Sequence, residues 1–254
     1  YFNPILFKQI EQIGMEDFSA MTNTLIMIQA VLSLVAVFII SYLFRKFIDK
    51  KSFNSIGFSF KGFDFIAGSV LGIILVSVGF MILWMFNMLG IESYQFSFIN
   101  LIIGLFAIFC LAFFEEIFIR GYILNNLLNE YNQYTALIMS SIIFMAMHGL
   151  NPNINFLSLL NLFLAGLLLG NYYIYKKNLW FPTGLHVTWN YFQGYVLGFE
   201  ISGLQVDSVI AQKLQGPDLL TGGDFGFEGS ILCTCITIIG IYFINYKYRC
   251  NNRG

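Results

Sequence analysis

The chain has little charge for its length. Only 11% of its 254 residues are Asp, Glu, Lys or Arg, and the formal net charge is −1. Soluble domains carry about 25% of these residues. Hydrophobic residues make up 57% of the chain, and the mean hydropathy is +0.73. These values indicate a polytopic membrane protein rather than a soluble one. We expect the lipid bilayer as a partner and no nucleic acid.

The sequence also lacks the signals of a disulfide-rich, secreted, repetitive or multi-domain protein. The four cysteines lie in or beside apolar stretches, which excludes a disulfide framework (Cys110, Cys233, Cys235 and Cys250). We find no signal-peptide pattern, no internal repeat and no separate soluble domain. The sequence therefore predicts one integral membrane domain over residues 1–254. The chain begins with Tyr1 rather than Met, so we expect an upstream segment.

Apolar runs predict an all-α bundle of seven membrane spans, at about residues 22–44, 65–89, 99–122, 134–150, 155–175, 182–200 and 230–246. Residues 1–20 predict an interfacial amphipathic helix. Eleven basic residues lie in alternate loops, against two, Lys8 and Lys213, on the other side. By the positive-inside rule the C-terminus is cytoplasmic and the N-terminus outside, so an upstream span would make eight.

Two glycine features concern packing and loops. The pairs Gly68/Gly72, Gly166/Gly170 and Gly194/Gly198 have the small-xxx-small spacing that lets helices approach closely. The longest loop, residues 201–229, is rich in glycine. We interpret it as a flexible lid or a re-entrant element.

Three charged residues end the third predicted span. Fourteen residues with no charge, 101–114, lead directly into Glu115, Glu116 and Arg120. Three charges at the bilayer centre cost about 8–10 kcal/mol on insertion scales, so these residues need polar partners or water. Glu116 and Arg120 are four apart and can pair on one helix face. Glu115 lies about 100° around the helix and is left for chemistry.

Two histidines are the chain's only imidazoles, and both lie in apolar sequence. His148 ends the fourth predicted span, while His186 opens the sixth with Asn190 one turn later. A lone histidine here would fit a packing role, but the whole set predicts one shared site. A glutamate in a low-dielectric site can act as a general base on water, and imidazole and amide groups can stabilise an oxyanion.

Zinc remains an open alternative for this set. Glu115, His148 and His186 could ligate the ion and leave its fourth position to water. A His-Glu-x-x-His helix is absent, as is a Gly-x-Ser-x-Gly elbow. No aspartate is central in a predicted span, and we interpret Cys110 as inert packing.

Three ordered motifs carry a family resemblance: Glu-Glu-x-x-x-Arg at 115–120, Phe-x-x-x-His at 144–148 and His-x-x-x-Asn at 186–190. Together they resemble the CPBP family, the CAAX-processing and bacteriocin-processing intramembrane endopeptidases, also called the Abi or type II CAAX protease family. The resemblance covers a catalytic core of about residues 95–200. It implies an all-α membrane fold. The short loops of this chain suit a family member from a bacterial cell membrane.

The resemblance also implies roles. Glu115 would activate water with His148, His186 and Asn190 would stabilise the tetrahedral oxyanion, and Glu116 and Arg120 would brace the site. Such enzymes are often labelled metalloproteases. The implied substrate is a peptide or protein at the membrane, either with a prenylated C-terminus or with a leader peptide.

Two other functions are compatible with the same residues. One is a non-catalytic membrane scaffold or regulator that retains the protease fold, and the other is a transporter with a proton relay.

Counting residues along the predicted spans raises a difficulty about the membrane depth of the site residues. It places Glu115 and His186 in the cytoplasmic half and His148 near the outer end of its span, unless the fourth span begins late, tilts or breaks.

Overall fold

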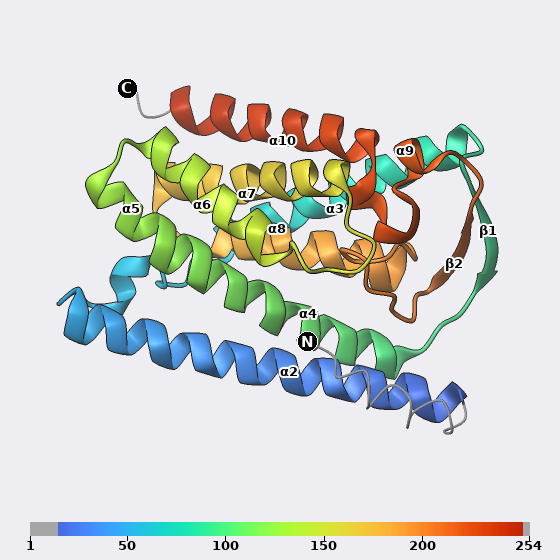
Figure 1. Cartoon of the computed structure of the whole chain (residues 1–254), viewed down its shortest axis with the longest axis horizontal. Coiled ribbons are helices and arrows are strands. Elements are labelled where there is room, and N and C mark those ends of the chain that lie inside the picture. The colour runs from blue at the N-terminus through green and yellow to red at the C-terminus, as the bar shows by residue number, and fades with distance from the viewer. Residues whose placement is uncertain (1–14, 251–254) are drawn as a thin grey trace.

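The computed structural model describes residues 15–250, with side chains described for residues 25–248. As predicted, it is a bundle of α-helices (Figure 1). The α-helices are α2 (Met15–Leu43), α3 (Gly62–Met85), α4 (Phe98–Glu116), α5 (Asn125–Glu130), α6 (Gln133–Met147), α7 (Phe156–Lys176), α8 (Trp180–Tyr191), α9 (Asp218–Thr221) and α10 (Ile231–Cys250). The interfacial helix predicted for residues 1–20 lies mostly outside the described residues; positions 15–20 belong to α2.

Shorter segments complete the described chain. Three are π-helical: η1 (Phe44–Ile48), η3 (Ile117–Leu124) and η4 (Phe192–Val196). Three are 3₁₀ turns: η2 (Phe53–Ile56), η5 (Gly223–Phe225) and η6 (Phe227–Gly229). The segments η3 and η4 follow α4 and α8 without a break; η3 begins within the first sequence motif, and η4 begins just after the third.

Five helical segments of the described chain are long and apolar enough to cross a membrane: Leu25–Ile48, Gly62–Met85, Phe98–Glu130, Phe156–Lys176 and Ile231–Tyr248. The other two predicted spans correspond to α6, with 15 residues, and α8, with 12. Helices of that length reach about 22 Å and 18 Å, less than the ~30 Å hydrocarbon core. An all-α membrane bundle is therefore confirmed, but the count of seven spans is not.

The helices form an inner group between outer ones. In Figure 1, α2 and α4 lie along one side, α10 lies along the opposite side, and α3, α6, α7 and α8 fill the middle. Among the spanning windows, those of α2 and α10 are the least buried, at 17% and 28%, and that of α7 is the most buried, at 61%. Large apolar side chains are exposed on the outer helices, as lipid-facing surfaces require.

Glycines bring α3 and α8 into backbone contact. A Cβ atom at Gly68 would lie 2.0 Å from the carbonyl oxygen of Phe181, and one at Gly72 would lie 2.5 Å from that of Leu185. From the other side, a Cβ at Gly184 would lie 2.2 Å from the carbonyl oxygen of Phe65. The packing role predicted for Gly68 and Gly72 is confirmed, and it fixes the helix that carries His186 and Asn190.

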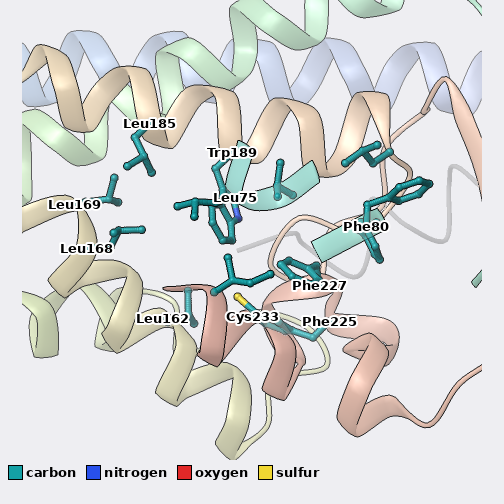
Figure 2. Close-up of a cluster of buried hydrophobic side chains, with 14 of the residues drawn as sticks. Leu75, Phe80, Leu162, Leu168, Leu169, Leu185, Trp189, Phe225, Phe227 and Cys233 are labelled. Carbon is teal, nitrogen blue, oxygen red and sulfur yellow. The ribbon is translucent and has the colours of Figure 1, made fainter. Parts of the chain in front are cut away.

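The segment between α8 and α10 is folded onto the bundle. Its strand β2 (Ile210–Leu214) pairs antiparallel with β1 (Leu89–Tyr94), with a register shift between Ile91 and Ser93. The sequence analysis missed this sheet, and the second span ends at Met85 rather than residue 89. Phe225 and Phe227 of the same segment are 1% and 0% exposed. They join side chains of α3, α7, α8 and α10 in the main core (Figure 2).

Candidate active site

Glu115 and Glu116 lie near the middle of the longest apolar helical segment. This segment runs without a break through α4, η3 and α5, from Phe98 to Glu130. The third helix therefore continues well past the predicted residue 122. The π-helical segment η3 begins at Ile117, directly after the two carboxylates. Single π-helical turns within α-helices frequently mark functional sites, because they re-aim the side chains around them.

Glu116 is the centre of a fully buried polar network. Its side chain is 0% exposed, and its Oε1 accepts a hydrogen bond from Arg120 Nη1 at 2.8 Å. The same oxygen lies 2.9 Å from His186 Nδ1. Because this carboxylate oxygen also accepts from Arg120, the imidazole Nδ1–H is the donor. Glu116 therefore fixes the orientation of His186 and keeps a proton on its Nδ1.

Arg120 joins this network to two other helices. Its Nη2 donates to the carbonyl oxygen of Gly166 in α7 at 3.3 Å. Its guanidinium carbon lies 4.6 Å from the ring centroid of Phe144 in α6. One buried cation thus touches a carboxylate, a backbone carbonyl and an aromatic face, and holds α6 and α7 against η3. The predicted pairing of Glu116 with Arg120 is present in the structure.

His148 lies at the C-terminal end of α6. Its Nδ1 is 2.9 Å from the carbonyl oxygen of Phe144, one turn earlier, and a carbonyl can only accept. The neutral imidazole thus carries its proton on Nδ1 and leaves Nε2 with a free lone pair. Because α6 ends at Met147 after 15 residues, His148 stays within the bundle. The short α6 resolves the difficulty of depth noted above.

Glu115 faces both imidazoles. Its Oε2 lies 3.7 Å from His148 Nε2 and 3.8 Å from His186 Nε2. These separations are too long for direct hydrogen bonds. Glu115 Oε2 is buried and has no hydrogen-bond partner among the described residues. One water molecule could sit about 2.8 Å from all three atoms, so the arrangement is suited to holding and deprotonating water.

Asn190 and both histidines line one cavity. The cavity encloses about 540 Å³ of space, open mouth included, between α6, α7, α8, α10 and the segment that precedes α10. The side-chain amide of Asn190 has no hydrogen-bond partner within residues 25–248 and is therefore free for a ligand. The structure thus brings together all six residues selected from the sequence. His148, His186 and Asn190 line the cavity, Glu115 contacts both imidazoles, and Glu116 and Arg120 support His186.

The three residues considered as zinc ligands are Glu115, His148 and His186. Among residues 25–248, the side chains are not arranged as a group of three or more His, Cys, Asp and Glu at metal-binding distances. Glu115 Oε2 is near both Nε2 atoms, and His186 Nδ1 is hydrogen-bonded to Glu116, which leaves Nε2 as its free ring nitrogen. A protein-bound water is one ligand that these atoms can hold and deprotonate.

Some parts of the site were not predicted. Gly166 had been selected only for helix packing, yet its carbonyl binds Arg120. Ser202 and Glu228 line the cavity from the segment that sequence analysis treated as a loop. A carboxylate next to glycines on a polar stretch looks like an ordinary surface loop, and no sequence signal separates Glu228 from Asp224.

Part of the chain is similar to a known protein family. Residues 97–192 match the family model described as type II CAAX prenyl endopeptidase Rce1-like, and this range contains all three motifs. No curated protein and no solved structure is significantly similar to the chain. The match supports a CAAX-type intramembrane protease, in agreement with the membrane helices. Over residues 97–192 the chain thus resembles the Rce1-like type II CAAX prenyl endopeptidases, the family that the three motifs predicted.

Proposed function

We propose that this protein is an intramembrane endopeptidase in which Glu115 and His148 activate water to hydrolyse a peptide bond. The observation that carries the proposal is the position of Glu115 Oε2, buried without a hydrogen bond and 3.7–3.8 Å from two imidazole Nε2 atoms. Three hydrogen-bonding atoms, Glu115 Oε2 and the Nε2 atoms of His148 and His186, surround one small space. A water molecule is the ligand that this geometry accommodates best.

The reaction uses two proton transfers. Glu115 takes a proton from the water while the water oxygen forms a bond to the carbonyl carbon of the substrate. His148 Nε2 accepts the second hydrogen bond of the water and holds its lone pair toward the carbon. When the tetrahedral intermediate collapses, the carbon–nitrogen bond breaks and Glu115 returns the proton to the leaving nitrogen. The products are a carboxylic acid and an amine, which exchange a proton to become a carboxylate and an ammonium group, and Glu115 is ionised again.

His186 and Asn190 stabilise the oxyanion in this proposal. Asn190 supplies an amide N–H. His186 supplies Nε2–H as an imidazolium, whose charge faces the Glu116 carboxylate 2.9 Å from Nδ1. Arg120 holds the Glu116 carboxylate in place by its 2.8 Å hydrogen bond. Glu116 and Arg120 are therefore positioning residues, which act on the substrate only through His186.

The same proposal covers substrate and location. We place the catalytic core in residues 95–200, within a single domain, and the protein in a bacterial cell membrane with its C-terminus in the cytoplasm. The substrate is a membrane-associated protein with a prenylated or leader-peptide segment. The many apolar side chains that line the cavity suit such a segment.

The substrate can be found by comparing membrane fractions. Cells carrying the wild-type protein, Glu115→Gln or the control Glu130→Gln would be compared by quantitative proteomics for an uncut precursor. Glu130 is exposed at the far end of the same helical segment. We expect the precursor to accumulate in Glu115→Gln alone. A regulator that keeps the fold without catalysis would give three identical fractions.

A further inference from the structure

The active-site cavity contains a second carboxylate that the proposed reaction does not use. The cavity that His148, His186 and Asn190 line is also lined by Ser202 and Glu228. Both residues lie outside the segment that matches the protease family, 97–192. We propose that Glu228 determines specificity by binding the cationic side chain of a substrate Lys or Arg. This inference rests on the proposed function, because it identifies the substrate of the same cavity.

Glu228 is held in place by hydrogen bonds from two directions. Its Oε2 accepts from the backbone N–H of Ser202 at 2.9 Å and from the Ser202 hydroxyl at 2.6 Å. Its backbone carbonyl accepts from Asn161 Nδ2 at 2.7 Å. Asn161 in turn donates to Ser230 and accepts from Thr234. Because α7, α10 and a loop hold this carboxylate in place, it loses little conformational entropy when it binds a ligand.

No cationic side chain within residues 25–248 neutralises this carboxylate. The ion pairs between described side chains involve Glu115, Glu116 and Asp49, and none involves Glu228. Its Oε1 has no hydrogen-bond partner among the described residues. An ionised carboxylate in partly buried surroundings is expensive without a counter-charge. A ligand cation supplies that charge, whereas a neutral side chain would leave the carboxylate unpaired.

The walls of the cavity suit the rest of a basic side chain. In the lining shared with the imidazoles and Glu228, α7 contributes Leu162, Leu168 and Leu169, and α8 contributes Leu185 and Trp189. Figure 2 shows these side chains pointing toward one another from the two helices. Lys and Arg place apolar stems along such surfaces and the charged tip at a polar end. A cavity with apolar walls and one fixed carboxylate in its lining matches that shape.

The length of the cavity limits where the basic residue lies in the substrate. The lining of α7 runs over nine residues, from Asn161 to Leu169, and the eight helical steps between these two span about 12 Å along the helix axis. An extended peptide covers this length in about three to four residues. We therefore place the Lys or Arg within about three positions of the bond that is cut.

The test compares peptide binding to purified full-length protein in nanodiscs. The probe is an N-acetylated peptide library with Lys or Arg at each position, matched with norleucine at the same positions. A charge-assisted hydrogen bond predicts about 10- to 100-fold tighter binding of the basic peptides to the wild-type protein. Glu228→Gln can still accept the Ser202 hydrogen bonds, and it should remove most of this preference without weakening the binding of norleucine peptides.

Three further variants sharpen the result. Glu228→Asp keeps the charge and should keep part of the preference. Asp224→Asn removes an exposed carboxylate of the same loop outside the cavity lining, and should change nothing. In Glu115→Gln the binding preference should remain although cleavage is lost, which separates failure of this inference from failure of the proposed catalysis.

Two results would overturn the assignment of Glu228. One is equal binding of Lys and norleucine peptides by the wild-type protein, and the other is a basic preference that survives in Glu228→Gln. A preference that appears only in peptides with a free N-terminus would assign the carboxylate to a terminal ammonium group and would also refute the side-chain proposal.

Discussion

Glu115 and Glu116 are adjacent in the chain but have opposite surroundings. Glu116 is 0% exposed and shares one oxygen between Arg120 and His186. Glu115 is 17% exposed, and its buried Oε2 has no hydrogen-bond partner among the described side chains. The helix turns by about 100° per residue, so neighbouring residues face different helices. One carboxylate therefore stabilises the fold, and the other is left available to a substrate.

This difference predicts opposite effects for two similar substitutions. Glu116→Gln leaves Arg120 buried without its counter-charge and should lower the free energy of unfolding by about 3–5 kcal/mol. Glu115→Gln should lower it by less than about 1 kcal/mol, because Glu115 pairs with no fixed cation. Thermal or denaturant unfolding of both variants in the same lipid or detergent provides the comparison.

A double variant checks the cause of the Glu116 effect. Glu116→Gln combined with Arg120→Met removes the unpaired cation and should recover part of the lost stability. If the double variant were less stable than Glu116→Gln alone, the loss would come from packing and not from the buried charge.

At the scale of elements, α8 depends on α3 for its position. The two helices touch through Gly68, Gly72 and Gly184, where even a Cβ atom would meet backbone. The small-xxx-small spacing predicted close packing, but a spacing does not name the partner helix. The partner follows only from the fold, in which α3 and α8 lie side by side. Since α8 carries His186 and Asn190, the glycines of α3 control the geometry of the site indirectly.

A methyl group at Gly68 tests this dependence. Gly68→Ala would place Cβ 2.0 Å from the carbonyl oxygen of Phe181 and should force α3 and α8 apart. Overpacking of this kind typically lowers stability by about 1–3 kcal/mol. We expect a lower unfolding temperature and weaker proteolysis. The control is Gly62→Ala, where the nearest neighbour is the ring of Phe60 at 3.4 Å. Equal behaviour of the two variants would contradict the proposed contact.

Helix lengths were less predictable than motifs. The apolar run around Phe144 continues to Leu150 in the sequence, yet α6 ends at Met147 and a turn follows. Hydropathy does not distinguish a helix that stops beside His148 from one that continues to the surface. Strands β1 and β2 are more than a hundred residues apart in the sequence, so no local sequence pattern predicts that they pair. The π-helical segments also lack a sequence signature.

At the scale of the whole molecule, charge placement and polar residues in apolar sequence were the strongest signals. The three motifs predicted one site because charged and imidazole groups are costly in lipid unless they meet. The structure places them together from α4, α6 and α8. Glu228 was not predictable, because its importance depends on the cavity it faces. Its segment folds back onto the bundle through Phe225 and Phe227.

The charge asymmetry predicts how the molecule lies in the membrane. Lys51 follows η1, near the end of the bundle that holds most basic residues, and Lys213 lies in β2. Both are exposed. In a variant with alanine at the four native cysteines, Lys51→Cys should react with an impermeant maleimide only from the cytoplasmic side. Lys213→Cys should react only from the opposite side. The reverse labelling would refute the proposed orientation.

The central claim is that Glu115 activates water within the bundle. The most direct measurement is the rate at which purified protein in lipid cuts the precursor identified by proteomics, compared between the wild type and Glu115→Gln. Loss of a general base predicts a decrease in kcat/KM of about 10²- to 10⁴-fold, with unfolding unchanged. In ¹⁸O-labelled water, the wild-type product should carry one labelled oxygen at its new carboxylate. Cleavage by Glu115→Gln at the wild-type rate would contradict the account.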